Sequence, residues 1–93
     1  MKIGLCIIEL YFPYSHSLKE KRAIVNKIKE RIKSRFNVAL AEIGYQDLWQ
    51  RSKIGLVTIG NGKDIVEKTF QSISRFIEDE LGESLLSMEI EVM

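Results

Sequence analysis

The chain has few of the residues from which metal and redox sites are usually built. Its 93 residues include one cysteine, one histidine, one proline and one tryptophan. A lone cysteine has no partner for a disulfide or a metal-binding Cys-x-x-Cys pair, and zinc sites need three or four ligands. We therefore expect neither a metal nor a cofactor. We interpret Cys6 as a buried, reduced thiol that packs as a small hydrophobe.

Catalytic and targeting motifs are missing as well. The sequence contains no P-loop, no dinucleotide-binding glycine motif, no nucleophile elbow and no His-Glu-x-x-His, so we do not expect an enzyme. The apolar run near the start, residues 3–8, is too short to span a membrane and does not resemble a signal peptide. These absences predict a cytoplasmic protein with no membrane partner.

Formal charge is nearly balanced overall but unevenly divided along the chain. The net charge is +1, yet residues 1–53 contain 11 Lys and Arg against 5 Asp and Glu, a net +6. Residues 54–93 contain 3 against 8, a net −5. A distribution of this kind can orient an anionic partner, can favour self-association, or can have no functional role.

Hydrophobic periodicity divides one domain, residues 1–93, into six elements. The patterns predict strands over 2–12, 37–45, 53–60 and 88–93, and helices over 18–35 and between the turn at 60–62 and Gly82. The first strand is apolar on both faces, which indicates a central strand covered on both sides. The last strand has one polar face, which suits a sheet edge.

The order βαββαβ predicts an α+β, ferredoxin-like fold, in which both helices lie on one face of a four-stranded antiparallel sheet. In this topology the first helix begins at the sheet end where the second and third strands connect. We therefore expect Ser15–Arg22 and Gln46–Arg51 to meet in space. The other sheet face is open and apolar, and we expect a second copy or another protein to cover it.

The segment Ser15–Arg22 begins the first helix and concentrates positive charge. Ser17 and Glu20 have the spacing of a capping box. The first turn also carries three cations, Lys19, Lys21 and Arg22. One interpretation is a solvated turn whose charge Glu20 offsets. The other is an anion site that includes His16 and Ser17, because exposed helix N–H groups and cations together suit a phosphate.

Lys21 differs from the other two cations because it falls within the apolar arc of the helix. Since it lies in the first turn, its ammonium should reach the end of the sheet, near Asp47 or the carbonyls of the connection between the second and third strands. We favour a structural role, in which Lys21 ties the helix start to that connection, over a role in ligand binding.

The connection Gln46–Arg51 lacks the Asn-Gly signal of a tight hairpin and contains Trp49. One interpretation is that Trp49 and Leu48 close the core over the Lys21 stem. The other is an aromatic platform that stacks a base while neighbouring cations such as Arg51 hold phosphate. The middles of the first and third strands contain no aromatic residue, so base stacking on the sheet, as in RNA-recognition motifs, is not expected.

Three segments of the chain carry a family resemblance. They are His16-Ser-Leu-Lys-Glu-Lys-Arg22, Asn37-Val-Ala-Leu-Ala-Glu-Ile43 and Gln46-Asp-Leu-Trp-Gln-Arg51. Together they resemble the YlxP-like family (DUF503), small bacterial proteins of unknown function. The resemblance implies a ferredoxin-like domain of cytoplasmic proteins whose genes often neighbour translation and ribosome-maturation factors. It implies neither an enzyme nor any catalytic residue.

These observations lead to two functional hypotheses of different classes. The first is RNA or ribosome binding through the basic end of the domain, with the candidate residues Lys19, Lys21, Arg22, Trp49, Gln50 and Arg51. The alternative is a non-enzymatic protein-interaction or homodimerisation module that uses the open sheet face. A phosphate-ester or acyl-phosphate hydrolase that uses Lys21, Arg22 and His16 is least favoured, because no nucleophile or metal set accompanies them.

Overall fold

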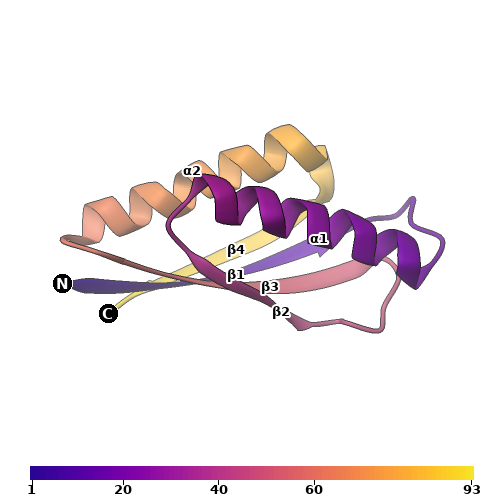
Figure 1. Cartoon of the computed structure of the whole chain (residues 1–93), viewed down its shortest axis with the longest axis horizontal. Helices are drawn as coiled ribbons and strands as arrows, with labels where there is room; N and C mark the ends of the chain where they lie inside the picture. Colours follow the sequence, from indigo (N-terminus) through magenta and orange to yellow (C-terminus); the bar gives the residue numbers. More distant parts are fainter.

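Two helices and a four-stranded antiparallel sheet form two layers in the computed structural model, which describes all 93 residues (Figure 1). Both helices, α1 (Leu18–Arg35) and α2 (Lys63–Leu81), lie on the same face of the sheet. The strands are β1 (Lys2–Tyr11), β2 (Ala39–Gly44), β3 (Arg51–Gly60) and β4 (Leu85–Val92). Their spatial order is β2-β3-β1-β4, and the 3-10 turn η1 (Gly82–Ser84) leads from α2 into β4. The predicted ferredoxin-like fold is confirmed.

The core lies between the sheet and the helices. Alternate residues of β1 and β3 point toward the helices, and Cys6, Ile8, Leu10, Ile54 and Leu56 are almost completely buried there. The helices contribute apolar side chains at helical spacing, namely Val25, Ile28 and Ile32 from α1 and Val66, Phe70, Ile73 and Ile77 from α2. Burial raises the pKa of the Cys6 thiol to about 12, so the thiol stays protonated in the folded protein.

The boundaries of α1 agree with the predicted helix, whereas two strands begin earlier than predicted. β3 begins at Arg51 and β4 at Leu85. The long central strand β1 explains both extensions, because its last residues offer backbone groups that need partners. Tyr11 pairs with Arg51, and Leu10 pairs with Leu85.

The prediction that the first strand is covered on both sides was wrong for the single chain. The helices cover the β1 side that includes Gly4 and Cys6, while Ile3 on the opposite side is 38% exposed. Both helices lie on the same face because both strand–helix–strand crossovers in this topology are right-handed. The apolar residues on the second face of β1 therefore have no cover within the chain.

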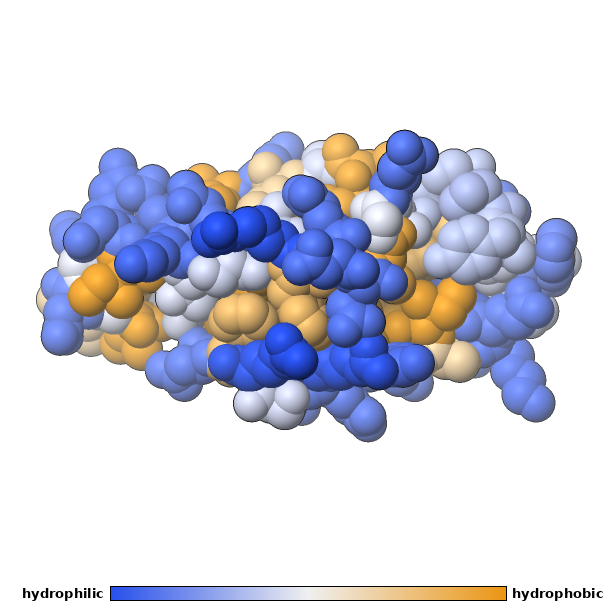
Figure 2. Space-filling model, turned by 90° about the horizontal axis from the view of Figure 1, so that it is seen from above, coloured by the Kyte–Doolittle hydropathy of each residue, from blue (hydrophilic) through white to orange (hydrophobic).

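The surface on the side of the helices is mainly hydrophilic, with separate apolar patches between the charged side chains (Figure 2). Neither helix is both long enough and apolar enough to cross a membrane.

Gly4 permits the close approach of α2 to β1. A Cβ at this position would lie 2.2 Å from Val66 Cγ1 and 2.7 Å from Phe70 Cε2. We expect Gly4→Ala to lower the free energy of unfolding by about 1–3 kcal/mol, the usual cost of overpacking. Urea unfolding of dilute protein measures this loss.

Gly55→Ala is the matched control, since Gly55 lies in the neighbouring strand but on the open face. Its added methyl meets only the side chain of Ile43, which is itself exposed, at 3.2 Å. This variant should stay within about 0.5 kcal/mol of the parent protein. Equal losses for the two variants would contradict the close approach at Gly4.

Candidate functional site

The start of α1 and the β2–β3 connection meet at one end of the sheet, as the topology predicted (Figure 1). The Gln50 side-chain amide donates to the carbonyls of Pro13 at 2.9 Å and Ser15 at 3.3 Å. The Phe12 amide donates to the Gln50 carbonyl at 2.7 Å. Gln50 therefore joins the two segments. We call Tyr11 together with Ser15–Arg22 and Gln46–Arg51 the loop-end surface.

Lys21 belongs to the α1 segment of this surface but is not exposed, because its side chain is completely buried. Its ammonium donates to Glu42 Oε2 at 2.8 Å, to the Tyr45 carbonyl at 3.0 Å and to the Gln46 carbonyl at 3.2 Å. An ammonium has three N–H donors, and three acceptors surround it here. The predicted contact with the connection carbonyls is confirmed, but the acidic partner is Glu42 rather than Asp47. Lys21 thus has a structural role and no donor left for a phosphate.

Glu42 is one of the site residues that sequence reasoning did not single out. It lies on the helix-facing side of β2, and its side chain is only 16% exposed. Burial alone would raise the pKa of this carboxyl. The hydrogen bonds from Lys21 and from the Ser52 hydroxyl, at 2.7 Å, together with the Lys21 charge, outweigh burial and hold the pKa below its usual value. The sequence did contain a signal for this residue, because strand alternation places the Glu42 carboxylate on the same face as the apolar residues Val38 and Leu40.

The first turn of α1 already contains its own anion. Ser17 Oγ accepts from the Glu20 amide at 3.1 Å, and Glu20 Oε2 accepts from the His16 amide at 2.6 Å. A phosphate held by His16 and Ser17 would have to compete with this carboxylate, so the geometry favours the solvated-turn interpretation. Lys19 and Arg22 are exposed and form no ion pair.

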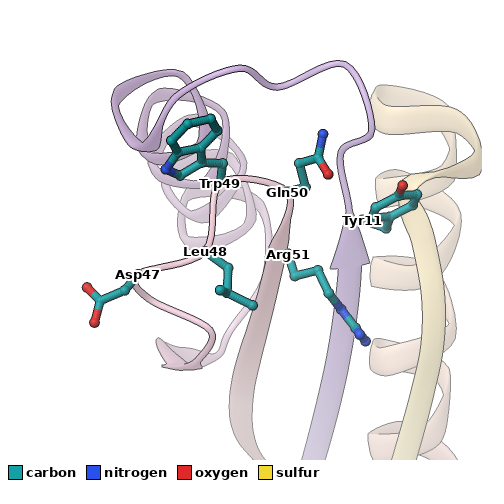
Figure 3. Close-up of a pocket in the computed structure, with 6 residues that line it drawn as sticks. All are labelled: Tyr11, Asp47, Leu48, Trp49, Gln50 and Arg51. Atoms are coloured by element: carbon teal, nitrogen blue, oxygen red, sulfur yellow. The ribbon is translucent and has the colours of Figure 1, made fainter.

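Trp49 does not close the core over Lys21, because its side chain is 56% exposed and Leu48 is 46% exposed. Instead, the loop lines an open hollow of about 590 Å³. Its lining residues are Tyr11, Asp47, Leu48, Trp49, Gln50 and Arg51 (Figure 3). Trp49 and Tyr11 lie on opposite sides of this hollow, and the Asp47 carboxylate points away from it. An aromatic ring is thus presented to solvent next to a cavity.

Arg51 supplies the positive charge of the hollow. Its guanidinium lies 4.7 Å from the centre of the Tyr45 ring, and Nη2 donates to Glu9 Oε2 at 3.3 Å. Its Nε is buried without a hydrogen-bond partner. Lys53 approaches the other Glu9 oxygen at 3.7 Å. Tyr11 and Tyr45 were not predicted as site residues; the signal for Tyr11 is its pairing with Arg51 across the sheet.

The Lys21 network makes a specific stability prediction. Removing one member of a buried ion pair costs about 3–5 kcal/mol. Glu42 would keep Ser52 and some solvent contact, so we expect Lys21→Met to cost about 3 kcal/mol, at the lower end of that range. Thermal or urea melts measure the loss. Lys19→Met, an exposed change on the same turn, should shift stability by less than about 0.5 kcal/mol, and equal shifts for both variants would contradict the structural role.

The lowered pKa of Glu42 predicts how acid acts on the fold. A carboxyl whose pKa is lower in the folded state stabilises the protein above its unfolded pKa, and this contribution is lost as pH falls through the folded value. Glu42→Gln removes the titration. The parent protein should therefore lose more stability than Glu42→Gln between neutral pH and strong acid, as measured by urea unfolding across pH. The control Glu30→Gln changes an exposed residue, and its stability should depend on pH as that of the parent does. If the stabilities of the parent and of Glu42→Gln change with pH in parallel, Glu42 does not contribute to acid unfolding.

Comparisons with known proteins agree with this architecture. The family model described as a protein of unknown function (DUF503) matches residues 3–90. The uncharacterised protein YlxP of Bacillus subtilis (strain 168) is 40% identical over 76 residues, which cover 82% of this chain and 83% of that protein.

Similar solved structures support the fold alone. The de novo designed protein Foldit4 has a TM-score of 0.56 at 14% identity, covering 100% of this chain and 97% of the design. A de novo designed protein with ferredoxin fold has a TM-score of 0.50 at 11% identity, covering 100% and 83%. Because the family model spans almost the whole chain and the Bacillus relative matches most of it, the resemblance seen in three segments is confirmed: this chain belongs to the DUF503 family.

Proposed function

We propose that this protein binds single-stranded RNA at its loop-end surface, where Trp49 stacks on a base. The observation that carries the proposal is the exposure of the chain's single tryptophan at the edge of a hollow. Tryptophan side chains are on average well buried in proteins, but the ring of Trp49 does not cover the core. A hollow of about 590 Å³ lies within the size range of ligand pockets and admits a base.

Three cations support the proposal. Lys19 and Arg22 are exposed and unpaired on the first turn of α1, and Arg51 contributes a guanidinium to the hollow itself. Cationic side chains beside an aromatic platform are the usual means of holding a single strand, because phosphates meet the cations while bases stack. Lys21 is not part of this set, since its ammonium is used inside the fold.

The proposed ligand is single-stranded because a base that is not paired with another base is free to stack on a protein side chain. The family resemblance implies gene neighbours in translation and ribosome maturation, so ribosomal RNA is the first ligand to test. The proposed role is binding without catalysis.

Replacing Trp49 tests the stacking contact. Stacking is worth about 1–3 kcal/mol per base, so Trp49→Ala should weaken RNA binding by about tenfold. Fluorescence anisotropy with a labelled single-stranded RNA measures this change. Leu48→Ala, the exposed neighbour in the same loop, is the control and should bind almost as the parent does. Unchanged binding by Trp49→Ala would exclude the stacking role.

Replacing cations tests the phosphate contacts. Each phosphate neutralised on a single strand contributes a slope of about −0.7 to log K against log salt. Lys19→Ala with Arg22→Ala should flatten that slope by about 1.4. The control is Lys27→Ala with Lys33→Ala, which removes the same charge from exposed positions of the same helix. If the parent protein shows no salt-sensitive RNA binding at low ionic strength, the proposed function is wrong.

A further inference from the structure

The sheet face opposite the helices carries an apolar centre that nothing in the chain covers. We call this surface, made of the outward residues of the four strands, the open face. Val57 is 45% exposed and Ile59 is 54% exposed on it. A hollow of about 360 Å³ lies over its middle and is lined almost entirely by apolar residues of β1, β2 and β3, including Leu5, Ala41 and Gly55. Contiguous apolar surface of this kind marks an interaction site.

The strand register of the open face pairs unlike residues. Between β1 and β3, Ile7 lies beside Gly55, and Glu9 lies beside Lys53. In the first pair a large side chain lies beside a glycine that leaves a hollow. In the second pair a negative charge lies beside a positive one. Neighbouring rows, Leu5 with Val57 and Ile3 with Ile59, are apolar on both sides.

This register makes the open face complementary to itself. A two-fold axis that runs parallel to the strands, between β1 and β3, places β1 of one copy over β3 of the other at the same level. Ile7 would then enter the hollow above Gly55 of the second copy. Glu9 would face Lys53 of the second copy, and its own Lys53 would face the second Glu9.

We propose that the occupant of the open face is a second copy of this chain, related by this strand-parallel two-fold axis. The edge strands agree with the choice of axis. In register, Glu89 of β4 is level with Ala41 of β2, and Glu91 is level with Ala39. The strand-parallel axis therefore lays glutamate stems over alanines and leaves the carboxylates at the rim. An axis perpendicular to the strands would instead place β4 over β4 and oppose four glutamates, an unfavourable arrangement.

The area of the open face suits such a dimer. The strands contain 34 residues in total, and a spacing of about 3.3 Å along strands and about 4.8 Å between them makes the face roughly 550 Å² in plan. Two copies together bury roughly 1,100 Å² or more, which is enough for a biological interface at the small end of the range. A dimer that dissociates at micromolar concentration is expected. The axis keeps both loop-end surfaces at the same end of the dimer.

Charge reversal tests this geometry. In a homodimer, Glu9→Lys leaves positions 9 and 53 of both copies positive, beside Arg51, and Lys53→Glu leaves both positions negative, with Arg51 still beside Glu9. Each variant alone should be monomeric in sedimentation velocity at a concentration where the parent protein is dimeric. An equimolar mixture should form a heterodimer, because both lysines of one copy then face glutamates of the other. Both changes lie on partly exposed side chains, and circular dichroism checks that each variant folds.

A second variant tests the apolar centre without charge pairing. Val57→Lys places an ammonium near the axis at an exposed position, and it should also produce a monomer. A parent protein that remains monomeric at high micromolar concentration overturns the proposal. A dimer that ignores both charge reversals, or variants whose mixture stays monomeric, overturns it as well.

This test is independent of the proposed function. RNA binding is measured on the parent protein and on the loop-end variants, in which Glu9, Lys53 and Val57 are unchanged; Glu9→Lys is not used for it, because Glu9 pairs with Arg51 of the hollow. If the heterodimer forms but the parent protein does not bind RNA, the dimer proposal stands and the RNA proposal is refuted. If the parent protein binds RNA but never dimerises, the RNA proposal stands and the dimer proposal is refuted.

Discussion

The buried ammonium of Lys21 is the contact on which the loop end of this fold depends. It joins α1, the end of β2 and the following connection. Gln50 and the Phe12 amide add hydrogen bonds between that connection and the segment before α1. Two of the acceptors of Lys21 are backbone carbonyls, so Lys21 determines the path of the loop and not only its charge. Tyr45, at φ 60°, is one of those acceptors, and few non-glycine residues adopt this conformation without support from their surroundings.

An ion pair of this kind does not have to raise stability above that of an apolar substitute. Desolvating two charges can cost as much as their attraction returns, and well-packed apolar replacements are often as stable. The advantage of the pair is directional, because an ammonium with three fixed acceptors permits only one placement of the loop. We attribute the placement of this loop, in which Trp49 is exposed, to the geometry of this pair.

The fold followed from the sequence because each element had a clear period and the topology allowed few arrangements. The meeting of α1 with the β2–β3 connection followed from that topology, and the inward position of Lys21 followed from its place in the helical arc. Two features did not follow. Glu42 was not identified as the partner of Lys21, since strand alternation gives a face but not a distance across elements. The exposure of Trp49 was undecided, because loop conformation depends on hydrogen bonds such as those from the Gln50 side chain to the Pro13 and Ser15 carbonyls, which no local pattern encodes.

The single thiol has a practical consequence for studying motion in this protein. Cys6 lies at the middle of the central strand, between β3 and β4, and is fully inaccessible. A thiol reagent can reach it only when the sheet or the helix layer separates, so the labelling rate, compared with that of an exposed thiol, gives the free energy of opening when reclosing is fast. The native chain therefore carries an intrinsic probe of its central strand, without any engineered label.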